Sequence, residues 1–497
     1  MTKKYLSLLL AVVLVAVTFS ACTAQSPTSE HKLVTETTTE TVADTTNFKL
    51  SYSQSDSLNP FESQSLNNQV LEELIFDPLF TIDESYEIQP KIGASYSYND
   101  NKTITVTLND SVKFSDGTAV TADSVVYSFE QAKGSPHWGN SLKAISSAVK
   151  VDDKTVKFNL SYENPNAHNL LTFAIASDKS DDKGYSIGSG KYKYGDGDGE
   201  VFLELNSEHS DFSPRITKIT LINITSAESI INAVNIGNIS YAASDMSGTN
   251  GIRLQCNKKA VNLNNMVYLG INCKKGITKD ENIRKAISLA INRETLVKTA
   301  YQGYAKAATS VFNPASKLGK QTQIFSENED TSGAKQAIDQ SGAKAGSLNL
   351  TLVVNNSEAN KSAATYIKQQ LDAVGFNVTI SSLKGKKYLT AVQKGNFDIY
   401  LGETKLPNDM NLNSFYGSKG ATRYGIDLKN SQSGKSYDSY MKGEGEIGGF
   451  ILDFSKELPF IPLLYRQGMI CFTKSMHGDM QGYNGNYFSN IEDWYFD

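Results

Sequence analysis

The clearest alternation of hydrophobic and polar side chains in the sequence lies between residues 104 and 133. It begins with apolar or β-branched residues that alternate with polar ones, which is the period of a half-buried strand. The Ser-Asp-Gly sequence at 115–117 then favours a tight turn, because glycine tolerates a positive φ and aspartate bonds its own backbone. Thr121 stands at an N-cap position before apolar residues at helical spacing. The stretch therefore predicts a strand, a turn and a capped amphipathic helix.

The rest of the chain gives further helices that alternate with strands. We expect a helix at 68–79, a hairpin at 149–160, a helix pair at 283–297, and a strand, helix and strand at 348–381. Asn292 is expected to end the first helix of the pair and to cap the second. Such alternation implies an α/β protein whose ligand-facing loops lie at the strand ends.

Two blocks of sequence carry a resemblance to a known family. The residues VKFSDGTAVTADSVVYSFEQA at 112–132 closely resemble the signature block of family 5 of the extracellular solute-binding proteins, the peptide- and nickel-binding components of ABC importers. The residues IRKAISLAINRETLV at 283–297 are similar to a second block, with Asn292 where Asp is usual. The resemblance extends from about Phe48 to the C-terminus. Residues 434–449 depart from it, because they are rich in glycine and lack the family's longer helix.

The resemblance implies an architecture for this chain, whose 497 residues are too many for one ordinary core. It implies an α/β fold of the periplasmic-binding-protein type II, cluster C, with two hinged lobes and an extra small α/β domain. We expect lobe I at 48–85, 186–268 and 478–497, the small domain at 86–185, and lobe II at 269–477. The lobes should close on a solute without making or breaking a bond, so no enzyme activity, cofactor or metal is expected.

The N-terminus predicts export and a lipid anchor. Two lysines precede an apolar run from Leu6 to Val17, so residues 1–21 are typical of a signal peptide. The residues Phe-Ser-Ala-Cys ending at Cys22 resemble a lipobox, in which the thiol of the cysteine carries the lipid; plain secretion is the alternative. Residues 22–47 are rich in threonine and lack aromatic residues, which favours a disordered tether. We therefore expect an extracytoplasmic protein, periplasmic or on the cell surface, anchored to the membrane through Cys22.

Composition removes several classes of function. A net charge of −5 argues against nucleic-acid binding, and no interior apolar run approaches the roughly 18 residues of a membrane span. The five histidines are scattered, and residues 196–200 favour a charged hairpin turn over a calcium loop. The cysteines at 256, 273 and 471 have no CxxC partner, which argues against zinc; Cys256 and Cys273 are the nearest pair for a disulfide.

One catalytic pattern remains as a distant alternative. Gly-Tyr-Ser-Ile-Gly at 184–188 matches the nucleophile elbow of a secreted serine hydrolase that would use Ser186. A true elbow follows an apolar strand and opens a helix, whereas charged residues precede this one and glycines follow it. A glycine turn is therefore the favoured interpretation.

The candidate ligand contacts follow from what a peptide presents, which is an ammonium, a carboxylate and backbone amides. Peptide-binding members of the family place an Asp four residues before a Pro to pair with the peptide's amino terminus, and Glu403 has that spacing to Pro407. Arg423 is suited to a carboxylate, although it could equally form a surface pair. The full set of candidate contacts is Glu403, Asn411, Tyr416, Arg423 and Trp138. Glu403 as a solvated loop acid and Trp138 as a packing anchor remain open.

Together these features predict a monomeric solute-binding lipoprotein of an ABC importer. It would capture short peptides between its lobes and deliver them to a permease with its ATPase. The alternatives are a non-peptide solute, such as chelated nickel, an oligosaccharide or an opine-like compound, and the hydrolase described above. An adhesin or chaperone-like surface protein would differ by lacking a saturable small ligand.

Overall fold

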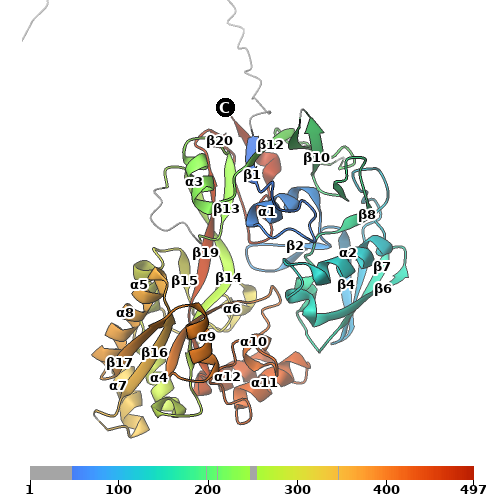
Figure 1. Cartoon of the computed structure of the whole chain (residues 1–497). Coiled ribbons are helices and arrows are strands. Elements are labelled where there is room, and N and C mark those ends of the chain that lie inside the picture. The colour runs from blue at the N-terminus through green and yellow to red at the C-terminus, as the bar shows by residue number, and fades with distance from the viewer. Residues whose placement is uncertain (1–47, 198, 210, 247–253, 345, 497) are drawn as a thin grey trace, which may run out of the picture. The chain divides into compact units, whose positions relative to one another are not determined.

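The computed structural model describes residues 48–197, 199–209, 211–246, 254–344 and 346–496 (Figure 1). The predicted signal peptide, Cys22 and the tether lie outside these residues. Across the described ranges, the helices are too short or too polar for any of them to cross a membrane. The chain is a mixed α/β protein with sheets of two, four and seven strands.

The stretch with the clearest pattern forms the elements that it predicts. Strand β5 (Thr103–Leu108) lies in an antiparallel sheet of order β4-β5-β7-β6, beside β4 (Gly93–Asp100), β7 (Thr155–Leu160) and β6 (Ile145–Asp152). Helix α2 (Ala122–Gly134) begins after Thr121, whose N–H donates to the Ser124 hydroxyl at 3.4 Å. Gly117 has a φ of +85°, and the Asp116 carboxylate accepts the Thr118 N–H at 2.9 Å. The predicted strand, turn, helix and hairpin are confirmed.

A second four-stranded sheet contains the start of the described chain. Its order is β1-β12-β11-β10, formed by β1 (Phe48–Tyr52), β12 (Lys218–Asn223), β11 (Glu200–Leu205) and β10 (Tyr192–Gly197). Helix α1 (Leu66–Ile75) packs beside it and ends three residues before Pro78, earlier than the predicted end at 79. The buried side chains of this sheet and of the β4–β7 sheet form one continuous core.

The largest sheet has the order β13-β19-β14-β18-β16-β17, with β15 (Ala305–Ala307) paired to β19. Its other strands are β13 (Tyr241–Ser244), β19 (Phe460–Phe472), β14 (Asn257–Ile271), β18 (Ile399–Lys405), β16 (Asn349–Asn355) and β17 (Asn377–Leu383). Strands β16 and β17 are parallel and are connected by α8 (Glu358–Ala373), which confirms the predicted strand-helix-strand unit.

Two long antiparallel strands of this sheet, β14 and β19, join the two main cores (Figure 1). The first part of β14, with Val261 and Leu263, is buried in the core of the four-stranded sheets, whereas Met266 and the residues after it are buried in the core of the large sheet. The pairing of β14 with β19 shifts register between Asn262 and Met266, where one core gives way to the other. The domain boundaries expected from the sequence stay a prediction.

The helix pair is also confirmed. Helices α4 (Glu281–Leu289) and α5 (Arg293–Ala300) meet at Asn292, whose side chain accepts the Thr295 N–H at 2.7 Å. The Arg293 guanidinium is buried and donates to the carbonyl oxygens of Pro462 at 3.1 Å and Ser288 at 3.3 Å.

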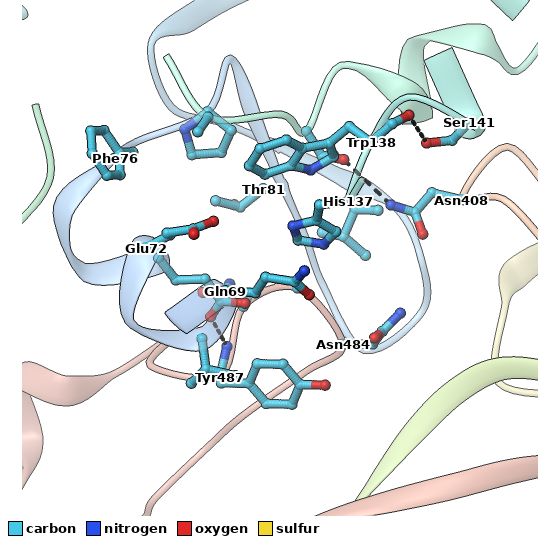
Figure 2. Close-up of a pocket in the computed structure, with 18 of the residues that line it drawn as sticks. Gln69, Glu72, Phe76, Thr81, His137, Trp138, Ser141, Asn408, Asn484 and Tyr487 are labelled. Atoms are coloured by element: carbon cyan, nitrogen blue, oxygen red, sulfur yellow. Dashed lines mark hydrogen bonds between the residues drawn. The ribbon is translucent and has the colours of Figure 1, made fainter. Parts of the chain in front are cut away.

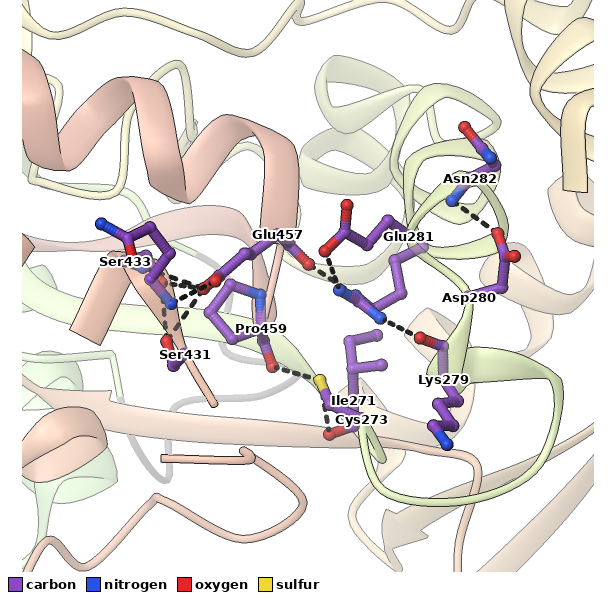
Figure 3. A network of polar contacts seen from close by, with 12 residues as sticks. Ile271, Cys273, Lys279, Asp280, Glu281, Asn282, Ser431, Ser433, Glu457 and Pro459 are labelled. Atoms are coloured by element: carbon purple, nitrogen blue, oxygen red, sulfur yellow. Dashed lines mark hydrogen bonds and ion pairs between the residues drawn. The ribbon is translucent and has the colours of Figure 1, made fainter. Parts of the chain in front are cut away.

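The glycine-rich residues 434–449 belong to two short helices and the turn between them, so no single long helix spans this stretch. Helix α11 (Gln432–Met441) is capped by Ser431, and α12 (Ile447–Glu457) buries Phe450 and Phe454. Figure 3 shows the Glu457 carboxylate accepting hydrogen bonds from Ser431 and Ser433, which ties the end of α12 to the start of α11. Packing of aromatic side chains and this bond outweigh the low helix propensity of glycine.

The remaining elements are short. They are β2 (Phe80–Ile82), β3 (Ile88–Pro90), β8 (Ala176–Ser180), β9 (Ser186–Gly188), β20 (Met476–His477), β21 (Tyr495–Phe496), α3 (Ala227–Asn235), α6 (Lys317–Gln321), α7 (Thr331–Ser341), α9 (Gly385–Gln393) and α10 (Asn413–Tyr416).

Candidate functional site

A cavity of about 470 Å³ is the strongest candidate for a ligand site (Figure 2). Helix α1, the loop after α2, the residues that follow β18 and the segment 484–489 all contribute to its wall. The apolar part of the wall includes Val70, Phe76, Leu263 and Leu406. Charged and amide side chains stand among these, and this mixture is typical of a site that fixes a small polar ligand.

Two aromatic rings form one side of the cavity. The His137 and Trp138 rings are stacked, with centroids 4.3 Å apart, as Figure 2 shows, and the indole also meets Phe61 edge-on at 6.2 Å. The Trp138 carbonyl accepts the Ser141 hydroxyl at 2.9 Å, which fixes the loop. The surrounding protein and the nearby Lys405 lower the pKa of His137 to about 4, although the residue remains exposed to solvent. His137 is therefore neutral at physiological pH.

The end of α1 brings acidic side chains to the wall. Burial raises the pKa of Glu73 to about 8, and its carboxylate accepts the backbone N–H of Tyr487 (Figure 2). Burial also raises the pKa of Glu72 well above the ordinary range, despite a hydrogen bond from the Ser63 hydroxyl. Asp77 forms an ion pair with Lys91 at 3.4 Å. Within the described residues, Glu73 takes part in no ion pair.

Basic side chains face the same cavity. Lys191 is paired with Glu492 at 2.7 Å, and Lys91 is paired with Asp77. Lys405 lies at the end of β18. It forms no ion pair with any residue in the described part of the chain. Loss of water lowers the pKa of Lys405, an effect that the Asp245 carboxylate opposes. The cavity thus combines a carboxyl group and an ammonium group for which the described residues provide no ion-pair partner.

Amide side chains complete the wall. The Asn408 side chain donates to the Thr172 hydroxyl at 3.4 Å, and the backbone carbonyl of Asn408 accepts a hydrogen bond from the Asn169 side chain at 3.4 Å. Asn140, Asn484 and Asn486 also line the cavity. Amides both donate and accept, so they suit the backbone of a peptide or the hydroxyls of a sugar.

The predicted ligand contacts are distributed over several places. Trp138 lines the cavity. Glu403 is exposed and does not line the cavity; its carboxylate accepts from the side chain of Asn265, a lining residue, at 3.0 Å and lies 3.5 Å from Arg466. Glu403 therefore stays a prediction as a ligand contact.

The other three predicted contacts have protein partners. Asn411 is buried, and its amide donates to the Asp409 carboxylate at 2.8 Å. Tyr416 stacks on Tyr437 at 5.2 Å between ring centroids. Arg423 lines a different cavity and donates to the carbonyl of Ser418. The structure brings none of these three into the wall described above, and their ligand roles stay predictions.

Sequence reasoning missed Glu73, His137 and Lys405. A signal for Glu73 was present, because the acidic pair at 72–73 falls on a helix whose neighbouring residues 70, 71, 74 and 75 are apolar. Lys405 stands two residues after Glu403 and so lies on the same face of β18. His137 directly precedes Trp138, but nothing in the sequence indicates which of the two rings faces a cavity.

The structure also shows the surroundings of the residues that the sequence offered as catalytic or metal-binding candidates. Ser186 opens β9 and pairs with Ser180 in a small hairpin, so it does not lie on the strand-to-helix turn of a nucleophile elbow. Strands β10 and β11 pair around residues 196–200, which confirms the hairpin turn. Searching the described ranges finds no group of three or more His, Cys, Asp or Glu placed to hold a metal ion.

The three described cysteines are free thiols. The thiol of Cys256 meets that of Cys471, not that of Cys273, the nearest cysteine in sequence. Cys273 instead lies 3.8 Å from the carbonyl oxygens of Ile271 and Pro459 (Figure 3).

Comparison with known proteins identifies a family for this chain. The family model of the bacterial extracellular solute-binding proteins, family 5, matches residues 87–425. The glutathione-binding protein GsiB of Escherichia coli K12 is 23% identical over 350 residues, which cover 66% of this chain and 67% of GsiB.

Solved structures agree on the fold. The periplasmic murein tripeptide-binding protein MppA, in an unliganded open form, has a TM-score of 0.73 at 20% identity, with 91% of this chain and 98% of MppA covered. NikA from Brucella suis, in complex with Fe(III)-EDTA, has a TM-score of 0.66 at 19% identity, covering 90% of this chain and 100% of NikA. The predicted type II periplasmic-binding-protein fold is confirmed. Because the family model matches more than half of the sequence, the chain belongs to family 5 of the bacterial extracellular solute-binding proteins, the substrate-binding components of ABC importers.

Proposed function

We propose that this protein captures short peptides in the cavity beside Trp138 and delivers them to an ABC permease with its ATPase. The observation that carries the proposal is that the cavity presents Glu73 and Lys405, neither of which has an ion-pair partner in the described part of the chain. A short peptide carries one ammonium and one carboxylate, so it supplies a partner for each. The names of GsiB and MppA, which refer to glutathione and a murein tripeptide, support the same class of ligand.

Each end of the peptide has a defined role in this proposal. The ammonium pairs with Glu73, and the carboxylate pairs with Lys405. Asn408 and Asn484 bond the peptide backbone, while Trp138 packs against a side chain. Glu403 accepts a hydrogen bond from the Asn265 side chain and so orients this lining residue. No bond of the peptide is broken.

This arrangement links binding to a proton. Burial raises the pKa of Glu73 to about 8, so the carboxyl is largely protonated at neutral pH without ligand. An ammonium beside it favours the charged form and lowers that pKa. Binding of a peptide therefore releases a proton from Glu73, and isothermal titration in buffers of different ionisation enthalpy detects the release.

The proposal is tested by native mass spectrometry of the purified protein, as isolated and after denaturing release of its ligands. We expect co-purified peptides, and we expect Glu73→Gln and Lys405→Met each to lose them while their thermal unfolding stays cooperative. Glu130→Gln is the matched control, since Glu130 is exposed and does not line the cavity, and it should retain most of the bound peptide. Peptides bound equally well by the two cavity variants would contradict the proposal.

A chelated metal is a second candidate ligand, favoured by the neutral imidazole of His137 at the cavity wall. A neutral imidazole is a good ligand for nickel or iron, and the NikA relative was solved with Fe(III)-EDTA. Titration with Ni(II)–histidine separates the two candidates. Saturable nickel binding that His137→Ala abolishes, with no co-purified peptide, would replace the peptide proposal.

We also propose that the protein is a monomeric lipoprotein held outside the cytoplasm by lipid on Cys22, with residues 22–47 as the tether. Its support is the sequence Phe-Ser-Ala-Cys after an apolar run. Metabolic labelling with an alkyne fatty acid should mark the wild-type protein, and Cys22→Ala should abolish the label and release the protein from membranes. A labelled Cys22→Ala protein would contradict the anchor.

A further inference from the structure

A second cavity, of about 660 Å³, has a strongly basic wall. Residues after β14, the turn after α9 and the loop 423–429 form this wall. Its cationic side chains are Lys274, Lys275, Lys394, Arg423 and Lys429, and Asp427 is its single carboxylate. We call this wall the basic groove. Its excess of cations contrasts with the chain's net charge of −5.

The cations of the basic groove are not used to pair with protein carboxylates. Within the described ranges, none of the five takes part in an ion pair. Arg423 donates to the carbonyl of Ser418, and the Asp427 carboxylate accepts the side-chain amide of Asn430 at 2.8 Å. Like charges that share one concave wall repel each other, so an anion that enters the groove gains the attraction of several cations together.

Hydrogen bonds from Asn272 and Cys273 fix the backbone of the basic groove. The Asn272 side chain donates to the carbonyl oxygens of Gly395 at 3.3 Å and Phe397 at 3.1 Å, which joins two parts of the wall. The Cys273 N–H donates to the Gly425 carbonyl at 3.0 Å, which joins the third. Gly425 has a φ of +86°, and a Cβ there would collide with the carbonyl of Ile271. These bonds and the close approach at Gly425 fix the backbone that carries the cationic side chains.

The basic groove is separate from the peptide cavity. The two cavities share no lining residue. Gly395, which lines the groove, precedes strand β18, and Lys405, which lines the peptide cavity, ends it. A strand of this length spans roughly 20 Å. A ligand in the basic groove would therefore not touch a peptide in the other cavity.

We propose that the basic groove binds a polyanion that carries phosphate groups. An arginine guanidinium pairs with two phosphate oxygens at once, and lysines supply compact charges around them. A single carboxylate ligand would leave most of the cations unpaired, whereas a chain of phosphates or a cluster of headgroups engages them together. Such an anion is either a free polyphosphate or the phosphate of lipid headgroups, and the chemistry of the groove is the same for both.

The first arm of the test uses sodium tripolyphosphate and isothermal titration calorimetry at two salt concentrations. We expect saturable binding that weakens as salt rises, because the contacts are ionic. The variant Lys275→Ala/Lys394→Ala/Lys429→Ala should weaken binding at least tenfold. The control Lys335→Ala/Lys344→Ala/Lys387→Ala removes the same charge from exposed lysines outside the groove and should leave binding within about twofold. Equal losses in both triple variants, or no binding in the wild type, would overturn the proposal.

The second arm identifies the source of the phosphate. It measures co-sedimentation with phosphatidylglycerol vesicles, with phosphatidylcholine vesicles as the neutral reference. The exported Cys22→Ala protein is used for every variant, so that no lipid anchor holds the vesicles. Loss of vesicle binding in the groove variant alone assigns the groove to lipid headgroups. Unchanged vesicle binding together with lost tripolyphosphate binding assigns it to a free polyphosphate. Peptide binding should stay unchanged in the groove variant, so its result does not depend on the proposed function.

Discussion

The carboxylate of Glu73 accepts the backbone N–H of Tyr487, and this bond joins the first long helix to the C-terminal segment at the wall of the peptide cavity. The two residues are far apart in sequence, so the contact forms when the chain is folded. Burial raises the pKa of Glu73 from 4.5 to about 8. In the folded protein, Glu73 therefore holds its proton across a pH range in which the unfolded chain has lost it.

This proton predicts how stability depends on pH. Between about pH 4.5 and 8 the folded state binds more protons than the unfolded state, so the Glu73 contribution to the free energy of unfolding is full below pH 4.5 and is lost as the pH rises through 8. Its slope is about 1.4 kcal/mol per pH unit. Glu73→Gln keeps the neutral shape and an oxygen for the Tyr487 N–H. We expect it to match the wild type near pH 4.5 and to be more stable by on the order of 3 kcal/mol near pH 7.

Urea unfolding without ligand, measured at several pH values, checks this prediction. Glu130→Gln changes an exposed carboxylate and serves as the control, with an expected effect within about 0.5 kcal/mol at every pH. A constant difference between Glu73→Gln and the wild type across the range would contradict a raised pKa of Glu73.

Trp138 predicts an optical signal for ligand binding. The chain has two tryptophans; Trp494 is fully buried, while Trp138 lines the cavity. A ligand that enters the cavity should change the emission of Trp138 and leave Trp494 as a constant background. Trp138→Phe should abolish the change and weaken binding by about 1 kcal/mol, because a smaller ring remains. Fluorescence titration and calorimetry of both proteins measure the two effects, and a ligand-induced change that persists in Trp138→Phe would assign it to Trp494.

Local signals in the sequence predicted most of the fold. Thr121 and Asn292 cap the helices that they were expected to cap, since capping depends on a few neighbouring residues. The end of α1 was misplaced by several residues, because the helix stops shortly before Pro78. The packing of the two short helices around 434–449 was not predicted, because the partners of Phe450 and Phe454 are distant in sequence.

The ligand site was less predictable than the fold for the same reason. Glu403 was chosen because of its spacing to Pro407, but its carboxylate bonds Asn265 and lies near Arg466, and Lys405 on the same face of β18 lines the cavity instead. Glu73 and Lys405 come together only through pairing of segments that lie hundreds of residues apart. Arg423 was recognised as a possible anion contact. The structure places it in the basic groove, which no short motif predicts because its lining residues come from separate segments.

The cysteines predict a selective chemical reaction. Cys256 is half-buried, and a hydrogen bond from Cys471 lowers the pKa of its thiol to about 7, whereas burial raises the pKa of Cys273 to about 11. At pH 7.5, iodoacetamide should therefore modify Cys256 well before Cys273, since the thiolate is the reactive form. Cys471→Ala removes the donor and should slow the reaction of Cys256. Peptide mass mapping over time measures both rates, and equal rates at Cys256 and Cys273 would contradict the prediction.

Arg293 predicts a large loss of stability when it is replaced. Its guanidinium is buried, lies 4.8 Å over the Phe325 ring and donates to the carbonyls of Ser288, Ser326 and Pro462. Burial lowers its pKa to about 10, so it is still charged at neutral pH. Arg293→Met keeps the length of the side chain but removes the donor from the two buried carbonyls of Ser288 and Pro462, at about 1–3 kcal/mol for each such group. We expect a loss of about 3 kcal/mol or more in the free energy of unfolding.

The matched control for that prediction is Arg215→Met, because Arg215 is exposed and lies over the Tyr495 ring at 4.4 Å. An exposed cation over a ring contributes about 0.5–1 kcal/mol, so the control should lose no more than that. Urea unfolding at neutral pH compares the two variants. Arg293→Lys separates charge from geometry: a lysine keeps the charge but cannot reach three carbonyls from one planar group, so it should recover less than half of the loss. If Arg293→Lys recovered all of the lost free energy of unfolding, the positive charge alone would account for the stabilisation, and the planar set of donors would not be needed.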